Sequence, residues 1–168
     1  ATNNINFTLE KRIMRNLILI FILTISLNMN AQVDSTYYQN AKEILLKYPK
    51  TRVTAEHLYN SAKTAYDETG IVVPYKLAIS QAIIETSLGN TGVGIKKNNP
   101  FSLNSPNGYI YYKDIEFGVL AYYRKMTKTY LKCKTIDQLL INFVNCNNQR
   151  YATTPLYEGR LRKVYYSL

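Results

Sequence analysis

Hydrophobic residues recur at helical spacing through much of the chain after residue 34. Three such runs, at residues 35–48, 54–70 and 74–89, each place their apolar residues on one helical face. Pro49 ends the first run, Thr54 can cap the second, and glycines close the second and third. The pattern predicts three helices, of which the second and third form a hairpin.

Helical periodicity disappears in the loop at residues 90–100. Two short apolar segments, Phe101–Asn104 and Tyr109–Tyr112, then flank a Ser-Pro-Asn-Gly turn with Asn107 and Gly108 at its tip. Alternating segments joined by such a turn are typical of two paired strands. The sequence therefore predicts one β-hairpin.

Three further helices complete the predicted chain. Asp114 can cap the first of them, and residues 136–144 and 155–166 form the other two. The predicted fold class is α+β, mostly α: a lysozyme-like helical domain with one small β-hairpin. Such an outline occurs with many activities and does not by itself fix a function.

An apolar run near the N-terminus is typical of a secretory signal peptide. Met14 and Arg15 precede the eleven-residue run 17–27, and the small residue Ala31 follows it. A membrane-spanning helix needs about 20 apolar residues, so this run is too short to be one. We expect residues 1–31 to be an upstream extension and a signal peptide cleaved after Ala31, which would make the protein secreted or periplasmic. An uncleaved membrane anchor is the alternative.

The charge balance narrows the choice of partners. The 168 residues include 21 Lys and Arg and 11 Asp and Glu, a net charge of +10. Without residues 1–31, which hold three basic residues and one acidic residue, 18 basic and 10 acidic residues remain, a net charge of +8. A basic exported protein meets anionic envelope polymers rather than nucleic acid. We therefore expect no nucleic-acid partner.

The chain offers little for metal or nucleophilic chemistry. His57 is its one histidine and lies among polar residues, so we expect it to be uninvolved and expect no metal or cofactor. Cys133 and Cys146 lie at opposite ends of a predicted helical segment roughly 15–20 Å long. Because bridged cysteines need Cα atoms within about 7 Å, we expect two free thiols.

Glu85 is the strongest catalytic candidate. It lies one turn from the end of the helix predicted at residues 74–89. The small residues Ala78 and Ala82 lie on the same side of that helix and would leave open space beside the carboxylate.

Four ordered motifs surround this candidate. They are the segment PYKLAISQAIIETSLGN at residues 74–90, the segment KNNPFSL, the strand YIYY, and the closing element YATTPLY. Together they closely resemble the N-acetylglucosaminidase domain of family 73 glycoside hydrolases over residues 58–166. The resemblance implies a catalytic domain at residues 51–168, preceded by an N-terminal helix and linker at residues 32–50.

The implied enzyme is an endo-β-N-acetylglucosaminidase that cleaves the β-1,4 bond between N-acetylglucosamine and N-acetylmuramic acid in peptidoglycan glycan strands. Glu85 matches the general acid, a carboxylic acid that partial burial keeps protonated. The positions implied to bind substrate are Asn98, Asn99, Phe101, Tyr112, Tyr151 and Tyr157. We expect a monomer without a stable membrane span.

The second catalytic group stays open. Glycosidases usually pair two carboxylates, yet residues 86–113 contain no acidic residue. Asp114 and Glu116 are the nearest candidates for a base, although the first also suits a helix cap and the second the positive end of a helix. The acetamido group of the substrate could serve instead.

Three substitutions depart from the family pattern. Leu88 stands where an aromatic residue is usual, Ser102 where glycine is usual, and Thr154 where aspartate is usual. The alternatives to the glucosaminidase interpretation are a lytic transglycosylase, a muramidase and a catalytically inactive peptidoglycan-binding module.

Overall fold

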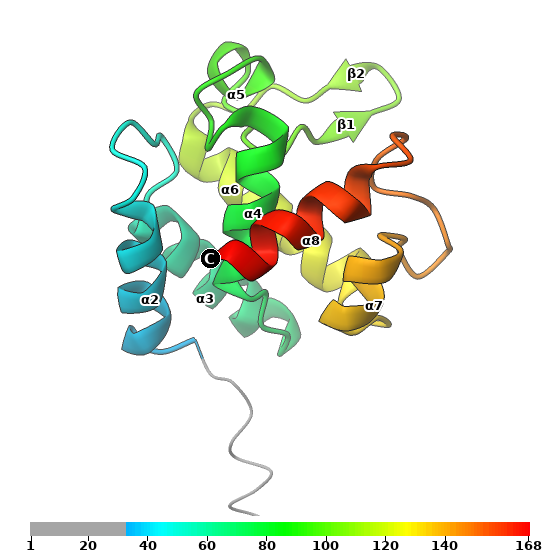
Figure 1. Cartoon of the computed structure of the whole chain (residues 1–168), viewed down its shortest axis with the longest axis horizontal. Coiled ribbons are helices and arrows are strands. Elements are labelled where there is room, and N and C mark those ends of the chain that lie inside the picture. The colour runs from blue at the N-terminus through cyan, green and yellow to red at the C-terminus, as the bar shows by residue number, and fades with distance from the viewer. Residues whose placement is uncertain (1–32) are drawn as a thin grey trace, which may run out of the picture. The chain divides into compact units, whose positions relative to one another are not determined.

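The structure, a computed structural model, describes residues 33–168, and helices make up most of it (Figure 1). In chain order the elements are α2 (Ser35–Leu45), α3 (Ala55–Thr69), α4 (Tyr75–Thr86), α5 (Val93–Lys96), β1 (Asn104–Ser105), β2 (Gly108–Tyr109), α6 (Ile115–Lys125), the π-helix η1 (Met126–Tyr130), α7 (Ile136–Ile141) and α8 (Tyr157–Ser167). The predicted fold class, mostly helical with one small hairpin, is confirmed. The predicted signal peptide lies outside the described residues.

Local capping residues account for the helix starts that the sequence predicts. The Thr54 side chain accepts the backbone N–H of His57 at 3.1 Å and begins α3, and the Asp114 carboxylate accepts that of Phe117 at 3.0 Å and begins α6. Helix α3 ends at Gly70, whose φ of 69° is in the left-handed region that glycine adopts without strain.

Two helices end earlier than their hydrophobic patterns predict. Helix α2 stops at Leu45 instead of residue 48, and α4 stops at Thr86 instead of Gly89. In α4 the cause is local backbone geometry, because Ser87 and Leu88 have φ values of 50° and 60°. The Leu88 side chain stays in the core, so its hydrophobicity extends the pattern past the true end of the helix.

The hairpin is shorter than predicted, and its turn is shifted by one residue. Strand β1 pairs antiparallel with β2 through Asn104 opposite Tyr109 and Ser105 opposite Gly108. The turn residues are therefore Pro106 and Asn107, and Gly108 lies in the strand. Of the flanking apolar residues, Phe101 and Leu103 lie in the core, whereas Tyr111 is exposed.

The expectation of two free thiols is wrong, because Cys133 and Cys146 form a disulfide with Cα atoms 5.7 Å apart. Helix α7 ends at Ile141 instead of residue 144, and the chain then folds back. The backbone N–H of Cys146 reaches the carbonyl oxygen of Thr129 at 2.9 Å. The separation expected for a continuous helix therefore does not arise.

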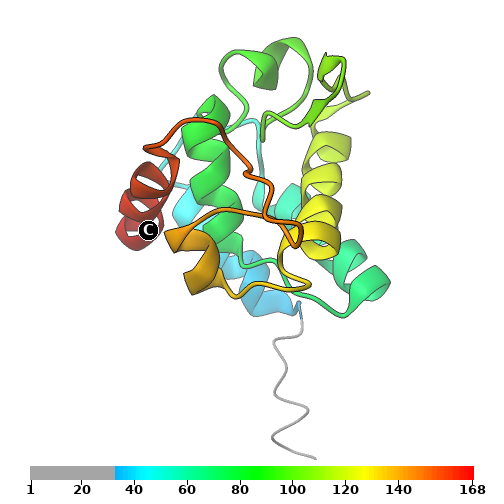
Figure 2. The same ribbon diagram turned by 90° about the vertical axis from the view of Figure 1, so that its right-hand side faces the viewer.

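Helix α4 runs through the middle of the described residues (Figures 1 and 2). Helix α8 crosses it on one side and α2 packs on it from another, while α3 packs on α2 and α6. The predicted hairpin of the second and third helices is wrong in this respect, since α3 and α4 pack mainly on other helices and not on each other. Within residues 33–168 no helix has the length and apolar character needed to span a membrane.

Aromatic residues fill the core beside α4. The rings of Phe101 and Tyr122 stack with centroids 3.7 Å apart, and both are fully buried. Tyr123 is also fully buried, and its hydroxyl forms a 2.7 Å hydrogen bond with that of Tyr37 from α2. This core holds α4, α6 and the loop after α5 in one fixed arrangement.

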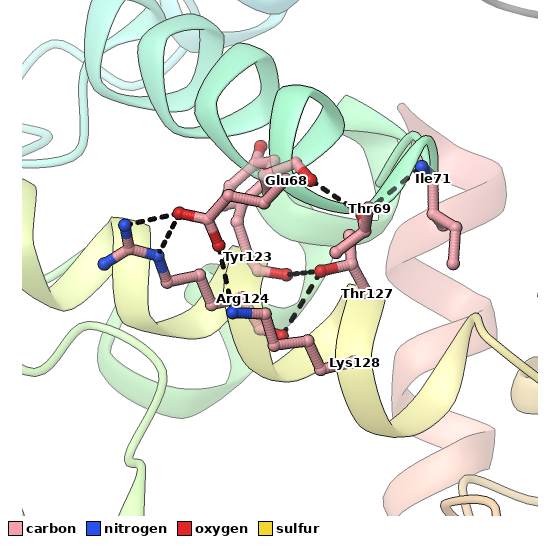
Figure 3. A network of polar contacts seen from close by, with 8 residues as sticks. Glu68, Thr69, Ile71, Tyr123, Arg124, Thr127 and Lys128 are labelled. Atoms are coloured by element: carbon pink, nitrogen blue, oxygen red, sulfur yellow. Dashed lines mark hydrogen bonds and ion pairs between the residues drawn. The ribbon is translucent and has the colours of Figure 1, made fainter.

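A charged cluster joins α3 to α6 and η1 at the surface (Figure 3). Glu68 accepts from the Arg124 guanidinium and lies 3.0 Å from the Lys128 ammonium nitrogen. The hydrogen bonds from Arg124 and Lys128 lower the pKa of Glu68. Exposed ion pairs of this kind stabilise proteins little, so the apolar packing carries the α3–α6 contact.

Candidate active site

A cleft of about 220 Å³ opens between the hairpin side of the molecule and the chain that leads into α8. Glu85 near the end of α4 lines it. The other lining residues are Ile84, Ser102, Asn104, Tyr109, Tyr151, Ala152, Thr153, Thr154, Tyr157 and Arg160. The cleft is mostly polar and open to solvent, with Glu85 the one carboxylate among its lining residues.

Glu85 is held at the cleft by the α4 helix, but not beside the open space that the sequence predicts. Ala78 and Ala82 are fully buried in the core and leave no gap next to the carboxylate. The space instead lies between α4 and residues 151–160, which come from the far end of the chain. The expectation for the two alanines is therefore wrong, whereas Glu85 does face a cleft.

Burial raises the pKa of Glu85 above its ordinary value. Polar contacts with the hydroxyls of Ser102 and Tyr157 oppose this rise, as does the positive charge of Arg160. The rise is the larger effect, so a greater share of the carboxyl stays protonated than in water. Such a group can donate a proton to a substrate oxygen in the cleft.

Tyr151 and Tyr157, both predicted from the sequence, form one wall of the cleft. Their rings stack with centroids 5.7 Å apart, and the Tyr151 hydroxyl donates to the carbonyl oxygen of Phe101 at 2.6 Å. Burial raises the pKa of each tyrosine well above its ordinary value, so both hydroxyls keep their protons. The wall is thus rigid, aromatic and uncharged.

Lys125 packs behind this wall. Its Nζ atom lies 5.6 Å from the centroid of the Tyr151 ring, and burial lowers its pKa. A cation over an aromatic face is attracted by the ring, which adds to the fixed orientation of Tyr151.

Asn99 and Phe101 support the site from within and do not line the cleft. Asn99 is fully buried, and its amide binds the backbone of Leu103 in both directions and donates to Ile110. Phe101 is fully buried against Tyr122. The prediction that these side chains contact sugar is not supported by their placement; they fix the loop that carries Ser102.

Asn98 has a similar supporting role. Its side chain accepts from Arg52 at 2.9 Å and donates to the carbonyl oxygen of Tyr112 at 3.1 Å. A Cβ atom built on Gly118 would clash with the Asn98 carbonyl oxygen, so only glycine lets α6 approach this loop.

The three remaining predicted site residues do not line the cleft. Tyr112 is half-buried in the loop before α6, where burial raises its pKa. Asp114 caps α6, and Glu116 is exposed in the first turn of that helix. The structure thus brings Glu85 together with Tyr151 and Tyr157, and it leaves Asp114 and Glu116 elsewhere.

Sequence reasoning missed several cleft residues and one buried residue behind them. Asn104 and Tyr109 flank the hairpin turn, and Arg160 belongs to a basic cluster with Arg162 and Lys163, but neither pattern indicates a cleft. Gln81 lies one turn before Glu85 on α4, and its Nε2 donates to the Tyr157 hydroxyl at 2.7 Å. A glutamine four residues before Glu85 on the same helical face was the available signal.

The described part of the chain offers no metal site. Within residues 33–168 no group of three or more His, Cys, Asp or Glu side chains could hold an ion. His57 has a local structural role, because its Nδ1 accepts the backbone N–H of Thr54 at 3.3 Å in the cap of α3.

Comparison with known proteins agrees with the geometry of the site. No curated protein matches the chain. A family model described as glucosaminidase, mannosyl-glycoprotein endo-beta-N-acetylglucosaminidase, matches residues 59–168, well over half of the chain and all of the cleft-lining residues. This family implies a glycoside hydrolase that acts on peptidoglycan glycan. The chain belongs to the glucosaminidase family.

Proposed function

We propose that this protein is an exported endo-β-N-acetylglucosaminidase that cleaves the β-1,4 bond between N-acetylglucosamine and N-acetylmuramic acid in peptidoglycan. The proposal includes export by a signal peptide cleaved after Ala31 and action in the cell envelope. The observation that carries it is the placement of Glu85, a partly buried carboxyl with a raised pKa in an aromatic-walled cleft.

Glu85 is the proposed general acid. Its proton passes to the glycosidic oxygen as the bond from the anomeric carbon to that oxygen breaks, and the bonding electron pair stays on the departing oxygen. Tyr151 and Tyr157 offer flat faces against which sugar rings can pack, and Asn104, Ser102 and Arg160 offer polar contacts.

The acetamido group of the substrate is the proposed nucleophile. Glu85 is the one carboxylate that lines the described cleft, and the Asp114 carboxylate is occupied by the cap of α6. A carboxylate pair at catalytic spacing is therefore not apparent in this cleft. The oxygen of the 2-acetamido group can instead attack the anomeric carbon, after which water opens the cyclic intermediate and restores the sugar.

Mass spectrometry of peptidoglycan fragments after digestion tests this proposal. Cleavage at N-acetylglucosamine leaves that sugar at the new reducing end, where borohydride reduces it. A dominant 1,6-anhydro-muramic acid product would indicate a lytic transglycosylase, and reducing muramic acid would indicate a muramidase. Tight binding to sacculi without any product would indicate a binding module.

A further inference from the structure

We propose that Gln81 is a positioning residue for Glu85, holding the Tyr157 hydroxyl so that its proton points at the Glu85 carboxyl. This inference rests on the proposed role of Glu85 as general acid. It concerns a fully buried side chain that does not line the cleft.

Three buried polar groups form a chain that leads from the core to the cleft. The Tyr122 hydroxyl donates to Gln81 Oε1, and Gln81 Nε2 donates to the Tyr157 hydroxyl oxygen at 2.7 Å. Tyr122 and Gln81 are fully buried, and Tyr157 is 6% exposed. Water does not compete for these bonds, so each buried group depends on its neighbour.

The series of hydrogen bonds has a direction because a phenol carries only one proton. Tyr122 uses its proton on the amide oxygen of Gln81, which turns the amide nitrogen toward Tyr157. Since Tyr157 accepts from that nitrogen, its own proton is free for another acceptor. Glu85 and Tyr157 both line the cleft, and the Tyr157 hydroxyl lowers the pKa of the Glu85 carboxyl.

Tyr122, at the core end of these hydrogen bonds, is held rigidly. The Tyr122 ring stacks on Phe101 and contacts Tyr123 edge to face at 5.5 Å. Gln81 lies on α4, one turn before Glu85, so the same helix fixes both ends of the link. The direction of the Tyr157 proton is therefore set by the core.

This arrangement favours proton release from Glu85. When Glu85 gives its proton to the glycosidic oxygen, the resulting carboxylate needs a donor, and the Tyr157 hydroxyl, whose own proton is not used by Gln81, can supply one at the cleft. The contact lowers the pKa of Glu85 against the rise caused by burial. Without Gln81 the Tyr157 hydroxyl would be free to rotate away, and the carboxylate would lose part of its stabilisation.

The test compares Gln81→Met with Ser80→Ala. Methionine keeps the length of glutamine but removes both hydrogen bonds. Ser80 is the matched control because it is also fully buried on α4, while its hydroxyl donates to the carbonyl oxygen of Lys76 in the same helix. Two readouts are used: the pH profile of peptidoglycan hydrolysis and a 13C NMR titration of the Glu85 carboxyl.

We expect Gln81→Met to raise the pKa of Glu85 further and to lower kcat roughly 10- to 100-fold with little change in KM. The alkaline limb of the pH profile should move to higher pH, whereas Ser80→Ala should leave both readouts in place. Tyr157→Phe should raise the pKa in the same direction, and combining it with Gln81→Met should add little more.

An unchanged Glu85 titration in Gln81→Met, or an equal shift in Ser80→Ala, would overturn the role of Gln81. If Gln81→Met does not fold, the pair Gln81→Met and Tyr122→Phe also removes the unpaired Tyr122 hydroxyl and carries the same expectation. If the unmodified protein releases no product from peptidoglycan, the proposed function fails, and the NMR titration still decides the role of Gln81.

Discussion

Glu85 combines partial burial with access to solvent at the cleft, and replacing it separates its chemical from its structural role. Glu85→Gln keeps the shape of the side chain but cannot donate the same proton. We expect peptidoglycan hydrolysis to fall by about 10²- to 10⁴-fold, measured as kcat, because that is the usual contribution of a general acid. Glu43→Gln, an exposed change on α2, serves as the control. Activity of Glu85→Gln near that of the control would remove Glu85 from the mechanism.

Glu85→Gln should also change how the stability of the protein depends on pH. Burial raises the pKa of Glu85 in the folded protein, so the protonated form is the one that folding favours. Its contribution to stability is complete below the unfolded pKa and is lost as the pH rises through the raised folded pKa. Glu85→Gln should therefore melt with the unmodified protein in acid and at a higher Tm at neutral pH.

Asp114 and Glu116 test whether the cleft needs a second carboxylate. Asparagine caps helices about as well as aspartate, so Asp114→Asn removes the charge while keeping the start of α6. If the substrate acetamido group is the nucleophile, Asp114→Asn and Glu116→Gln should each keep activity within about twofold, because neither residue lines the cleft. Loss of kcat in either variant, at unchanged Tm, would identify that residue as the base.

At the scale of elements, the segment between α7 and α8 carries Tyr151 of the aromatic wall and is held in place at two points. One is the disulfide, which closes a short loop with a sequence separation of 13. The other is Glu158 of α8, which accepts the backbone N–H of Phe143 at 3.0 Å and pairs with Arg150. These two restraints make the position of Tyr151 reproducible.

Removing the disulfide should destabilise the protein. For Cys133→Ser combined with Cys146→Ser we expect a loss of about 3 kcal/mol in the free energy of unfolding, the value typical of a loop of this size. Urea unfolding of the variant and of the unmodified protein, each with and without reductant, measures this. Reductant should weaken only the unmodified protein, and equal midpoints in oxidising buffer would contradict the expectation.

The contribution of Glu158 to stability should depend on pH in the opposite sense to that of Glu85. Burial alone raises the pKa of Glu158, but the hydrogen bond from Phe143 and the charge of Arg150 outweigh it and lower the pKa. The resulting stability is present above the unfolded pKa and is lost as the pH falls through the lowered folded pKa. Glu158→Gln should thus lower Tm at neutral pH, and the difference should shrink in strong acid. A constant difference across the pH range would count against the charge pairing.

The elements that the sequence predicts well are those governed by neighbouring residues. Thr54 and Asp114 cap their helices through bonds that span three residues, so local chemistry determines them. The Cys133–Cys146 bridge depends on the chain reversal after α7, which hydrophobic spacing does not indicate.

The candidate site residues divide in the same way, into those placed by neighbouring residues and those placed by distant contacts. The motif around Glu85 predicts a carboxylate near the end of a helix, and Glu85 does lie near the end of α4 at the cleft, because local helical geometry determines its position. The motif that contains Asn99 and Phe101 identifies an important loop but does not indicate that both side chains turn inward. Gln81 was missed because its partners, Tyr122 and Tyr157, are 41 and 76 positions away along the chain.

At the scale of the whole molecule, positive charge and the cleft meet at α8. Arg160 lines the cleft, whereas Arg162 donates to the carbonyl oxygen of Leu140 at 3.0 Å and so also has a structural role. Lys97 likewise donates to the carbonyl oxygen of Tyr109 at 2.8 Å. Arg160 is thus placed to attract an anionic polymer toward Glu85.

Binding to isolated sacculi should weaken as salt rises, because charges are screened over about 8 Å at physiological ionic strength. We expect Arg160→Gln to lower binding at low salt and to flatten the salt dependence. Lys63→Gln, an exposed change of equal charge on α3, should have a smaller effect. Binding is measured by co-sedimentation with sacculi, using Glu85→Gln as the background. Binding that does not change with salt would contradict an electrostatic attraction.

The hydrogen bond between Gln81 and Tyr157 also bears on the order in which parts of the protein can assemble. The two residues are 76 positions apart, and a ribosome delivers α4 long before α8. Until α8 emerges, α4 lacks the helix that crosses it and the Gln81 amide nitrogen lacks its acceptor, the Tyr157 hydroxyl. The cleft is therefore completed only once residues 151–160 are in place, and a chain halted before Tyr157 would contain Glu85 without the wall that faces it.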